Sequence, residues 1–371
     1  MRKTLYFAVA AIALMGCSKT EAVYTPSSEI GFIPVSKYDT KAAVEGTSYS
    51  VDYPFYVYAN AKNEGSTSFN SKYFEKVLFE PDGNTKDNGI QVYKGTPTQY
   101  WPNVNPLVFA GFTNTGNVSS ITPTTNTNLT SLILSNYTQP LPTVEGDNDL
   151  MYFFADNNNN GYDKTTNFVD PTMKHACSWI TININADSKL VDDLDGTREG
   201  VQAYWQNLKV TEVKFVKLHT TGTVTLTKGS PAAWDFTGQT EGSVDVKALS
   251  ASAMAITKAT GVEFADIAKN TIVLPQYPAY LSVTYTYTTP AGIDGFTETK
   301  VLPLNFDDEP RDQGYTDDQY RATWTKWEPG KHYIYNLTVT ANEIKIAPRS
   351  EDWVTDLNGN DTDDDNIGKD I

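Results

Sequence analysis

Two residues near the middle of the chain carry side chains that are often used for nucleophilic or metal chemistry. His175 and Cys177 lie two positions apart in a segment that we expect to be extended, so both would face one side of a strand. A histidine could activate the thiol as a nucleophile, or the two could begin a metal site. The sequence places no third group beside them. Because a buried cysteine is usually inert and apolar, we favour that interpretation.

The rest of the sequence gives little indication of catalysis. His219 and His332 are the other histidines, and His332 falls in a turn-rich segment where we expect a structural role. No nucleophile elbow, phosphate-binding glycine loop or zinc-ligand spacing occurs. We therefore expect a protein that is not an enzyme and that needs no cofactor.

One run of residues resembles the start of a calcium-binding loop. Asp156, Asn158 and Asn160 place oxygen ligands at positions 1, 3 and 5, and Gly161 follows at position 6. Position 12 is Asn167 and not the expected glutamate, and the flanking segments look like strands. The candidate metal ligands therefore compete with a simpler interpretation, a loop of Asn and Gly residues that favour left-handed turns.

The second cysteine, Cys17, ends an export signal. A basic start precedes the largely apolar residues 5–14, and the small residue Gly16 stands before the cysteine. The apolar run is far shorter than the roughly 20 residues that cross a bilayer, so we interpret residues 1–16 as a secretory signal peptide. The ending resembles the lipobox of bacterial lipoproteins, in which this cysteine carries the lipid. The alternative is an ordinary cleaved signal with a chance cysteine.

Charge and cysteine content narrow the range of partners. The chain of 371 residues has 29 basic and 45 acidic side chains; without residues 1–16 the balance is 27 against 45, or −18. Nucleic acid is not an expected partner, because phosphate binding needs a basic surface. If Cys17 is lipidated, Cys177 is alone and forms no internal disulfide. Plentiful Tyr and Phe with recurring Gly and Pro are typical of strands and turns.

Short segments with alternating apolar and polar residues recur along the chain. The clearest is 179–185, where isoleucine alternates with threonine or asparagine, and 107–112 is apolar enough for a strand buried on both faces. Many short strands between turns predict an all-β protein of sandwiches or barrels. The polar stretch 156–172 suggests a boundary. The expected division is a tether at 17–28, an N-terminal domain at 29–170 and a C-terminal domain with an acidic tail at 171–371.

The C-terminal third contains the run Trp327 to Tyr335, then a strand, Ile344-Lys345-Ile346 and Trp353. This ending resembles that of fimbrillin-like proteins, the type V pilins of Gram-negative anaerobes. Further short segments occur in the same order as in that family. Together with the lipobox they extend the resemblance over essentially the whole chain. These segments are residues 40–42 before 55–58, 100–102 before 107–110, 175–176 at the start of the Ile180 strand, and 274–276.

The resemblance implies two transthyretin-like β-sandwich domains in tandem, in a structural or adhesive subunit of a cell-surface fimbria, or pilus. It implies export as a lipoprotein, with acyl chains such as palmitate holding Cys17 in the outer membrane. It also implies assembly with other fimbrial subunits, and a host glycan or protein is a further candidate ligand. In this family a protease removes an N-terminal strand, and a neighbour's strand fills the groove. The expected exchange residues are Ile30, Phe32, Ile33 and Val35 in the leaving strand, and Ile344 and Ile346 in the donor region.

The sequence departs from the family's pattern at the processing site. Well-known members are cut after arginine, but no arginine lies between Cys17 and the first expected domain strands. Lys37 and Lys41 are the basic residues of the loop in question, so either a lysine-accepting protease cuts there or the subunit stays untrimmed. The tail 356–371 is rich in Asp and is a poor filler for an apolar groove. An untrimmed, lipid-held subunit would suit an anchor or a surface lipoprotein better than a shaft subunit, and the polar tail suits a tip subunit.

Tyrosines at alternate positions support an alternative function, a surface glycan-binding lipoprotein. Such rings could form an exposed platform for sugars, although tyrosines with this spacing more often pack one face of a sheet. The rings in question are Tyr56, Tyr58, Tyr285, Tyr287, Tyr333 and Tyr335.

Overall fold

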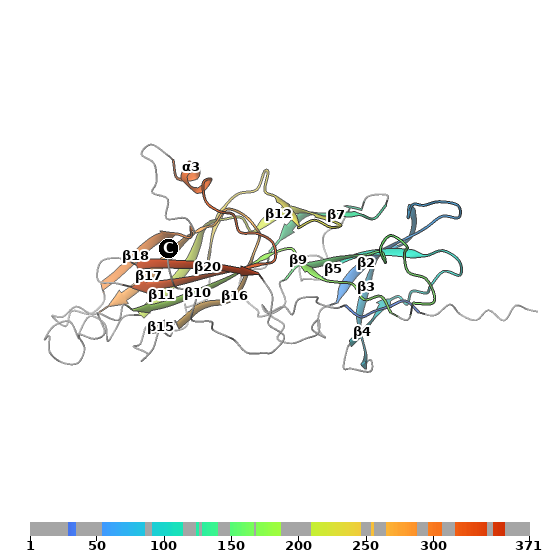
Figure 1. The fold of residues 1–371 in the computed structure, drawn as a ribbon. Coiled ribbons are helices and arrows are strands. Elements are labelled where there is room, and N and C mark those ends of the chain that lie inside the picture. The colour runs from blue at the N-terminus through green and yellow to red at the C-terminus, as the bar shows by residue number, and fades with distance from the viewer. Residues whose placement is uncertain are drawn as a thin grey trace, which may run out of the picture.

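A computed structural model describes most of the chain, and in these residues it is nearly all β (Figure 1). The predicted all-β class is therefore confirmed. The two β-rich halves lie end to end, with β7 and β12 between them. The described residues are 29–34, 54–85, 91–113, 124–125, 128–139, 149–166, 168–186, 209–245, 254–255, 265–287, 296–305, 316–339 and 344–352.

The N-terminal half contains a seven-stranded sheet in the order β1-β4-β3-β2-β5-β8-β9. Neighbouring strands in it are antiparallel, as expected for strands joined by short connections. The strands are β1 (Gly31–Phe32), β2 (Phe55–Ala61), β3 (Ser71–Thr85), β4 (Gln91–Thr96), β5 (Leu107–Thr113), β8 (Met151–Ala155) and β9 (Lys174–His175).

Both faces of this sheet are covered. Every residue of β5 is buried, which confirms the prediction from its apolar sequence. Phe109 packs into a core with Phe55 and Phe153, while Val108 and Phe112 pack into a second core on the opposite face. Alternation along the strands thus divides the side chains of one sheet between two cores.

A four-stranded sheet in the order β13-β12-β7-β6 packs against the second of these cores. β6 (Thr124–Thr125) and β7 (Ser131–Thr138) precede residue 170, whereas β12 (Thr221–Thr227) and β13 (Ala233–Asp235) follow it. β7 pairs with β12, and β9 pairs with β8 across the same position. Strands from the two sides of residue 170 therefore pair with one another. The domain division at 170/171 remains a prediction.

The C-terminal half packs two sheets around a third core, which includes Trp327. The first sheet has the order β16-β10-β19-β20, and β10 pairs with β19 in parallel. The second has the order β14-β11-β17-β18, and β15 also pairs with β11. The strands are β10 (Ser178–Ala186), β11 (Lys209–Leu218), β14 (Gly242–Asp245), β15 (Met254–Ala255), β16 (Ala265–Val273), β17 (Tyr280–Tyr287), β18 (Phe296–Pro303), β19 (Lys331–Val339) and β20 (Ile344–Asp352).

Strand β10 shows why the sequence folds in this way. Ile180, Ile182 and Ile184 are at most 1% exposed in the third core, whereas Asn183 and Asn185 on the other face are only partly buried. The alternation of isoleucine with polar residues therefore fixes which face meets the core, since a shift of one residue would reverse every side chain.

The helix α3 (Asp317–Arg321) is short and well capped. The Thr316 hydroxyl accepts a hydrogen bond from the Gln319 amide, and the Gln319 side chain accepts one from the Thr316 amide. This reciprocal capping satisfies two amide groups that a helix start leaves unpaired. The helix lies beside the C-terminal sandwich (Figure 1).

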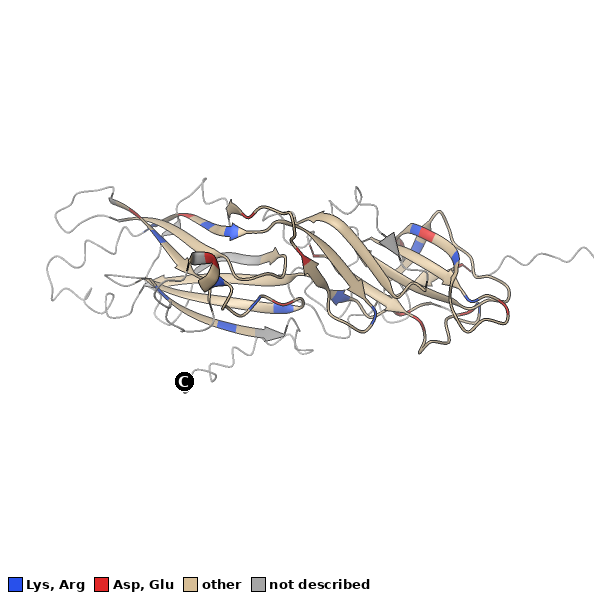
Figure 2. Ribbon diagram, turned by 90° about the horizontal axis from the view of Figure 1, so that it is seen from above, with Lys and Arg blue, Asp and Glu red and all other residues tan. Residues whose placement is uncertain are grey.

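Basic and acidic residues are interspersed along the described strands (Figure 2). Among the residues that the structure describes, no helix is long and apolar enough to span a bilayer.

Candidate functional site

Phe32 lies at the centre of the N-terminal core. Its ring centroid lies 4.8 Å from that of Phe79, 5.2 Å from that of Phe109 and 5.8 Å from that of Phe153, and the ring is fully buried. Ile30 and Ile33 on either side are 1% and 6% exposed. A segment of only a few residues therefore supplies the middle of a core to which strands β2, β3, β4, β5 and β8 also contribute.

The backbone of the same segment is held on both sides. Gly31 and Phe32 pair with β4, at Lys94 and Tyr93. On the opposite side the Ile33 amide donates to the carbonyl of Val169 at 2.8 Å, and the Val169 amide donates to the carbonyl of Gly31 at 2.9 Å. Residues 29–34 thus fill a groove between β4 and the segment around Val169.

Gly31 is required by the packing in this groove. A Cβ atom at this position would lie 2.7 Å from Cδ1 of Phe168, closer than real contacts allow. The missing side chain lets Phe168 lie directly against the strand.

The other residues predicted for export and processing lie outside the described part of the chain. These are Cys17, Val35, Lys37 and Lys41. Their assignments remain predictions.

The predicted donor residues lie in an edge strand. Among the strands that the structure describes, β20 pairs with β19 alone, in an antiparallel register that places Ile344 opposite Val339 and Ile346 opposite Leu337. Ile344 is 7% exposed and Ile346 is partly buried against the third core. In this structure the strand covers the core of its own chain.

His175 has a carboxylate partner that the sequence did not reveal. Its Nδ1 atom lies 2.6 Å from Oδ2 of Asp149, and both side chains are largely buried. Cys177 is fully buried in the connection to β10, and its Sγ lies 3.7 Å from Oε1 of Gln139. Burial, with a smaller contribution from Asp149, raises the pKa of the thiol. A neutral, enclosed thiol is a poor nucleophile, so this arrangement supports the structural interpretation of Cys177.

The calcium-like run forms a left-handed turn. Asn157, Asn158 and Asn159 have φ values of 46°, 55° and 68°, and the Gly161 amide donates to the carbonyl of Asp156 at 2.9 Å. The carboxylate of Asp156 pairs with the ammonium group of Lys228. Among the described residues no three His, Cys, Asp or Glu side chains gather as metal ligands. Calcium binding by Asp156, Asn158 and Asn160 remains an untested prediction.

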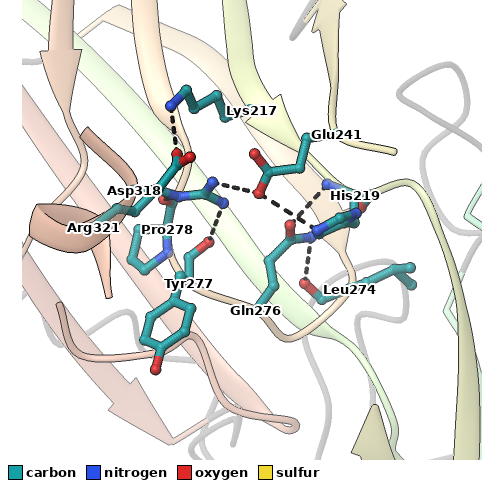
Figure 3. A network of polar contacts seen from close by, with 9 residues as sticks. All are labelled: Lys217, His219, Glu241, Leu274, Gln276, Tyr277, Pro278, Asp318 and Arg321. Atoms are coloured by element: carbon teal, nitrogen blue, oxygen red, sulfur yellow. Dashed lines mark hydrogen bonds and ion pairs between the residues drawn. The ribbon is translucent and has the colours of Figure 1, made fainter. Parts of the chain in front are cut away.

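Arg321 is the centre of a buried polar network (Figure 3). Its Nε donates to the carbonyl of Pro278 at 2.8 Å, its Nη2 donates to the carbonyl of Tyr277 at 3.2 Å, and its Nη1 pairs with Glu241. The guanidinium therefore fastens α3 to the segment before β17 and to the segment before β14. Lys217 of β11 adds a second link through Asp318 at 2.7 Å.

His219 borders this network. Its ring stacks on Phe236 with centroids 4.7 Å apart, and its Nε2 lies 3.4 Å from Oε1 of Glu241. Burial lowers the pKa of the ring, which outweighs the opposing effect of Glu241. The backbone amide of His219 donates to the side chain of Gln276, and the Gln276 amide group donates back to the carbonyl of His219. These contacts tie together chain segments and do not expose a reactive group.

His332 is also structural, as predicted. Its ring stacks on Trp179 with centroids 3.4 Å apart, and its Nε2 lies 2.9 Å from the hydroxyl of Thr181. The tyrosines proposed as a sugar platform are mostly in the cores: Tyr58, Tyr285, Tyr333 and Tyr335 are at most 8% exposed. These four rings cannot form an exposed platform.

Sequence reasoning missed Asp149, Lys228 and Arg321. Each lies far along the chain from its partner and within no motif, so no spacing signal could identify it. The apolar run around Phe32 indicated from the sequence that this residue lies in a strand.

Comparison with known proteins identifies the family. The sequence model of a family described as fimbrillin-like matches residues 40–353. Because this match covers most of the chain, the chain belongs to the fimbrillin-like family. Its members are structural adhesion proteins and not enzymes, so the chain has the role of a fimbrial subunit at the cell surface.

Solved structures show similar chains at low identity. A proposed cell adhesion protein from Bacteroides uniformis has 15% identity and a TM-score of 0.48, covering 88% of this chain and 99% of its own. A fimbrial protein from Bacteroides vulgatus has 14% identity and a TM-score of 0.46, with coverage of 88% and 99%. The tip fimbrial protein Mfa3 from Porphyromonas gingivalis, with a C-terminal truncation, has 11% identity and a TM-score of 0.40, with coverage of 88% and 100%. Comparison with curated proteins gave no significant match.

Proposed function

We propose that this fimbrial subunit assembles by β-strand addition and that residues 29–34 are the strand that leaves its groove. The observation that carries the proposal is the position of Phe32, whose ring fills the centre of a core although its strand has only two residues. The backbone of the segment bonds to β4 and to the segment around Val169, and its side chains fill the middle of the core. A neighbour's strand with a large apolar residue could take its place.

The energetic argument concerns the groove after the strand has left. Burial of each of Ile30, Phe32 and Ile33 is worth about 1.5–3 kcal/mol. An empty groove would expose apolar walls to water and would leave backbone groups of β4 and Val169 without their strand partners. A strand from another subunit would cover the apolar walls again and would pair with these backbone groups. Removal of the subunit's own strand therefore favours assembly.

We propose Lys37 or Lys41 as the point of processing and Cys17 as the lipid-bearing residue. Trimming after either lysine would release the lipid together with residues 29–34, whereas an untrimmed subunit would stay at the outer membrane as an anchor subunit or a surface lipoprotein. Replacement of Cys17 by serine should abolish incorporation of labelled palmitate and release the protein from the membrane fraction. Unchanged labelling in that variant would contradict the lipid assignment.

The test of strand addition is limited proteolysis of the soluble form, residues 18–371, with a lysine-specific protease. Mass spectrometry locates the cut, and size-exclusion chromatography with denaturing gels follows assembly. We expect a cut after Lys37 or Lys41, followed by a ladder of oligomers.

The matched control carries Lys37→Gln and Lys41→Gln and should remain uncut there and monomeric. An arginine-specific protease should leave the N-terminal segment intact, since it contains no arginine. A trimmed product that stays monomeric at high concentration would contradict assembly by loss of this strand.

A further inference from the structure

A pocket of about 160 Å³ lies between the seven-stranded sheet and the sheet that contains β7 and β12. Segments that are distant in sequence build it: the connection before β3, strand β5, the residues before β7, the end of β8 and the turn after β12. We call it the intersheet pocket. None of its lining residues belongs to the segment 29–34, although Phe109, which contacts Phe32, is one of them.

The floor of the intersheet pocket is apolar and partly aromatic. Phe69, Val108 and Leu129 line it and are 8%, 6% and 4% exposed, and the more accessible Phe154 also contributes. A cavity of roughly 150 Å³ holds one benzene molecule, so this volume suits a single six-membered ring. The floor offers that ring an apolar surface.

The rim of the pocket is polar and carries a neutralised charge pair. Lys228 pairs with Asp156, and its ammonium group also donates to Oδ1 of Asn159 at 2.8 Å. Asn128 adds an exposed amide. Because Lys228 is already bound to a carboxylate, an anionic ligand would have to compete with Asp156 for it. A neutral ligand with several hydroxyl groups meets donors and acceptors without that competition.

The backbone around the pocket is shaped to hold these groups. Leu129 has a φ of 51°, which is uncommon for a bulky residue, and it lies directly beside the pocket floor. The left-handed turn at 157–159 directs Asn159 to Lys228. At Gly161 a Cβ atom would lie 2.7 Å from Cε1 of Phe69, so this glycine allows the turn to close over the ring. The left-handed backbone at Leu129 and the left-handed turn at 157–159 thus both border the intersheet pocket.

We propose that the intersheet pocket binds one neutral hexopyranose unit, with the C–H face of the sugar over the apolar floor and its hydroxyl groups at the rim. A pyranose has this combination of an apolar face and a polar edge: its six-membered ring can lie over the floor while its exocyclic hydroxyl groups extend outward to the rim. Asn159 and the Lys228–Asp156 pair supply the hydrogen bonds that orient the sugar. The site gives the fimbrial subunit a ligand-binding function besides assembly.

The test is saturation-transfer NMR on the untrimmed soluble form, residues 18–371. The probes are methyl glycosides of D-glucose, D-galactose, D-mannose and N-acetyl-D-glucosamine, with methyl glucuronide as the anionic comparison. We expect at least one neutral glycoside to bind with a dissociation constant on the order of 1 mM, the affinity typical of a small ligand in a shallow site. The anionic glycoside should bind more weakly.

Two variants locate the binding. Asn159→Ala and Lys228→Met should each weaken binding at least fivefold, and Asn159 is exposed enough that its variant should fold normally. The matched control is Lys217→Met, which removes a lysine of similar exposure that pairs with Asp318 outside the pocket lining, and it should bind as the wild type does. The proposal is overturned if no neutral glycoside binds, if both pocket variants bind normally, or if the glucuronide binds best.

Discussion

Phe32 illustrates how one side chain can connect stability with assembly. Its ring contacts aromatic residues from β2, β3, β5 and β8, while its own strand contributes little pairing. The apolar run at 30–35 allowed the sequence to indicate a strand there. The sequence could not show that this strand fills the centre of a core, because that depends on four strands that are distant along the chain.

Replacement of Phe32 by alanine should destabilise the soluble form strongly. Loss of a fully buried phenylalanine typically lowers the free energy of unfolding by about 3–5 kcal/mol, because it removes apolar burial and leaves a cavity. Urea unfolding followed by tryptophan fluorescence measures the change. Val104→Ala is the control: Val104 is 89% exposed, and its loss should cost less than about 0.5 kcal/mol. Similar stabilities for the two variants would contradict the packing described for Phe32.

Buried tyrosines predict a loss of stability at alkaline pH. Burial raises the pKa of Tyr152 and Tyr333 to about 12, whereas tyrosine in an unfolded chain titrates near 10. Between these values the folded state holds more protons than the unfolded state. The stabilisation is therefore complete below pH 10 and is lost as the pH rises towards 12.

The measurement combines urea unfolding with absorbance of tyrosinate at several pH values between 8 and 12. We expect unfolding to become easier above about pH 10, and a fraction of the tyrosines to ionise only when the protein unfolds. Ionisation of all tyrosines near pH 10 in a protein that remains folded would contradict the burial of these rings.

At the level of elements, strands were more predictable than their connections. Period-2 alternation identified β10 and β19, and a continuous apolar run identified β5, because those patterns reflect which faces meet a core. The helix α3 was not predicted, since five residues are too few for a helical period to be recognised. Its position depends on Arg321, whose partners are 43 to 80 positions away.

Arg321→Ala should loosen α3 from the C-terminal sandwich. The change removes the donor for two backbone carbonyls and for Glu241, and we expect a loss of about 3 kcal/mol in the free energy of unfolding. Arg321→Lys should restore little, because one ammonium group cannot reach all three acceptors with the geometry of the planar guanidinium.

Hydrogen exchange followed by mass spectrometry separates this local effect from a general one. Exchange should accelerate most in peptides covering 316–330. Arg349→Ala, at an exposed position of β20, should leave exchange there unchanged. Equal exchange in the Arg321 and Arg349 variants would show that Arg321 does not fasten the helix.

At the scale of the whole molecule, the family and the all-β class could be predicted from the sequence, because the ordered motifs and the strand pattern extend along the chain. The arrangement of the sheets could not. The pairing of β7 with β12 joins residues more than 80 positions apart, and nothing in either strand specifies the other. The intersheet pocket follows from that pairing, so its residues did not stand out as a group in the sequence.

The central claim is that the groove of residues 29–34 accepts a strand from another molecule. The most direct measurement is binding of a labelled peptide, residues 27–36, to protein that has been trimmed after Lys37 or Lys41, monitored by fluorescence anisotropy. We predict saturable binding to the trimmed protein, none to the untrimmed form, and none for the peptide with Phe32→Asp. If the peptide fails to bind the trimmed protein, or if the Phe32→Asp peptide binds equally well, the groove does not accept strands as proposed.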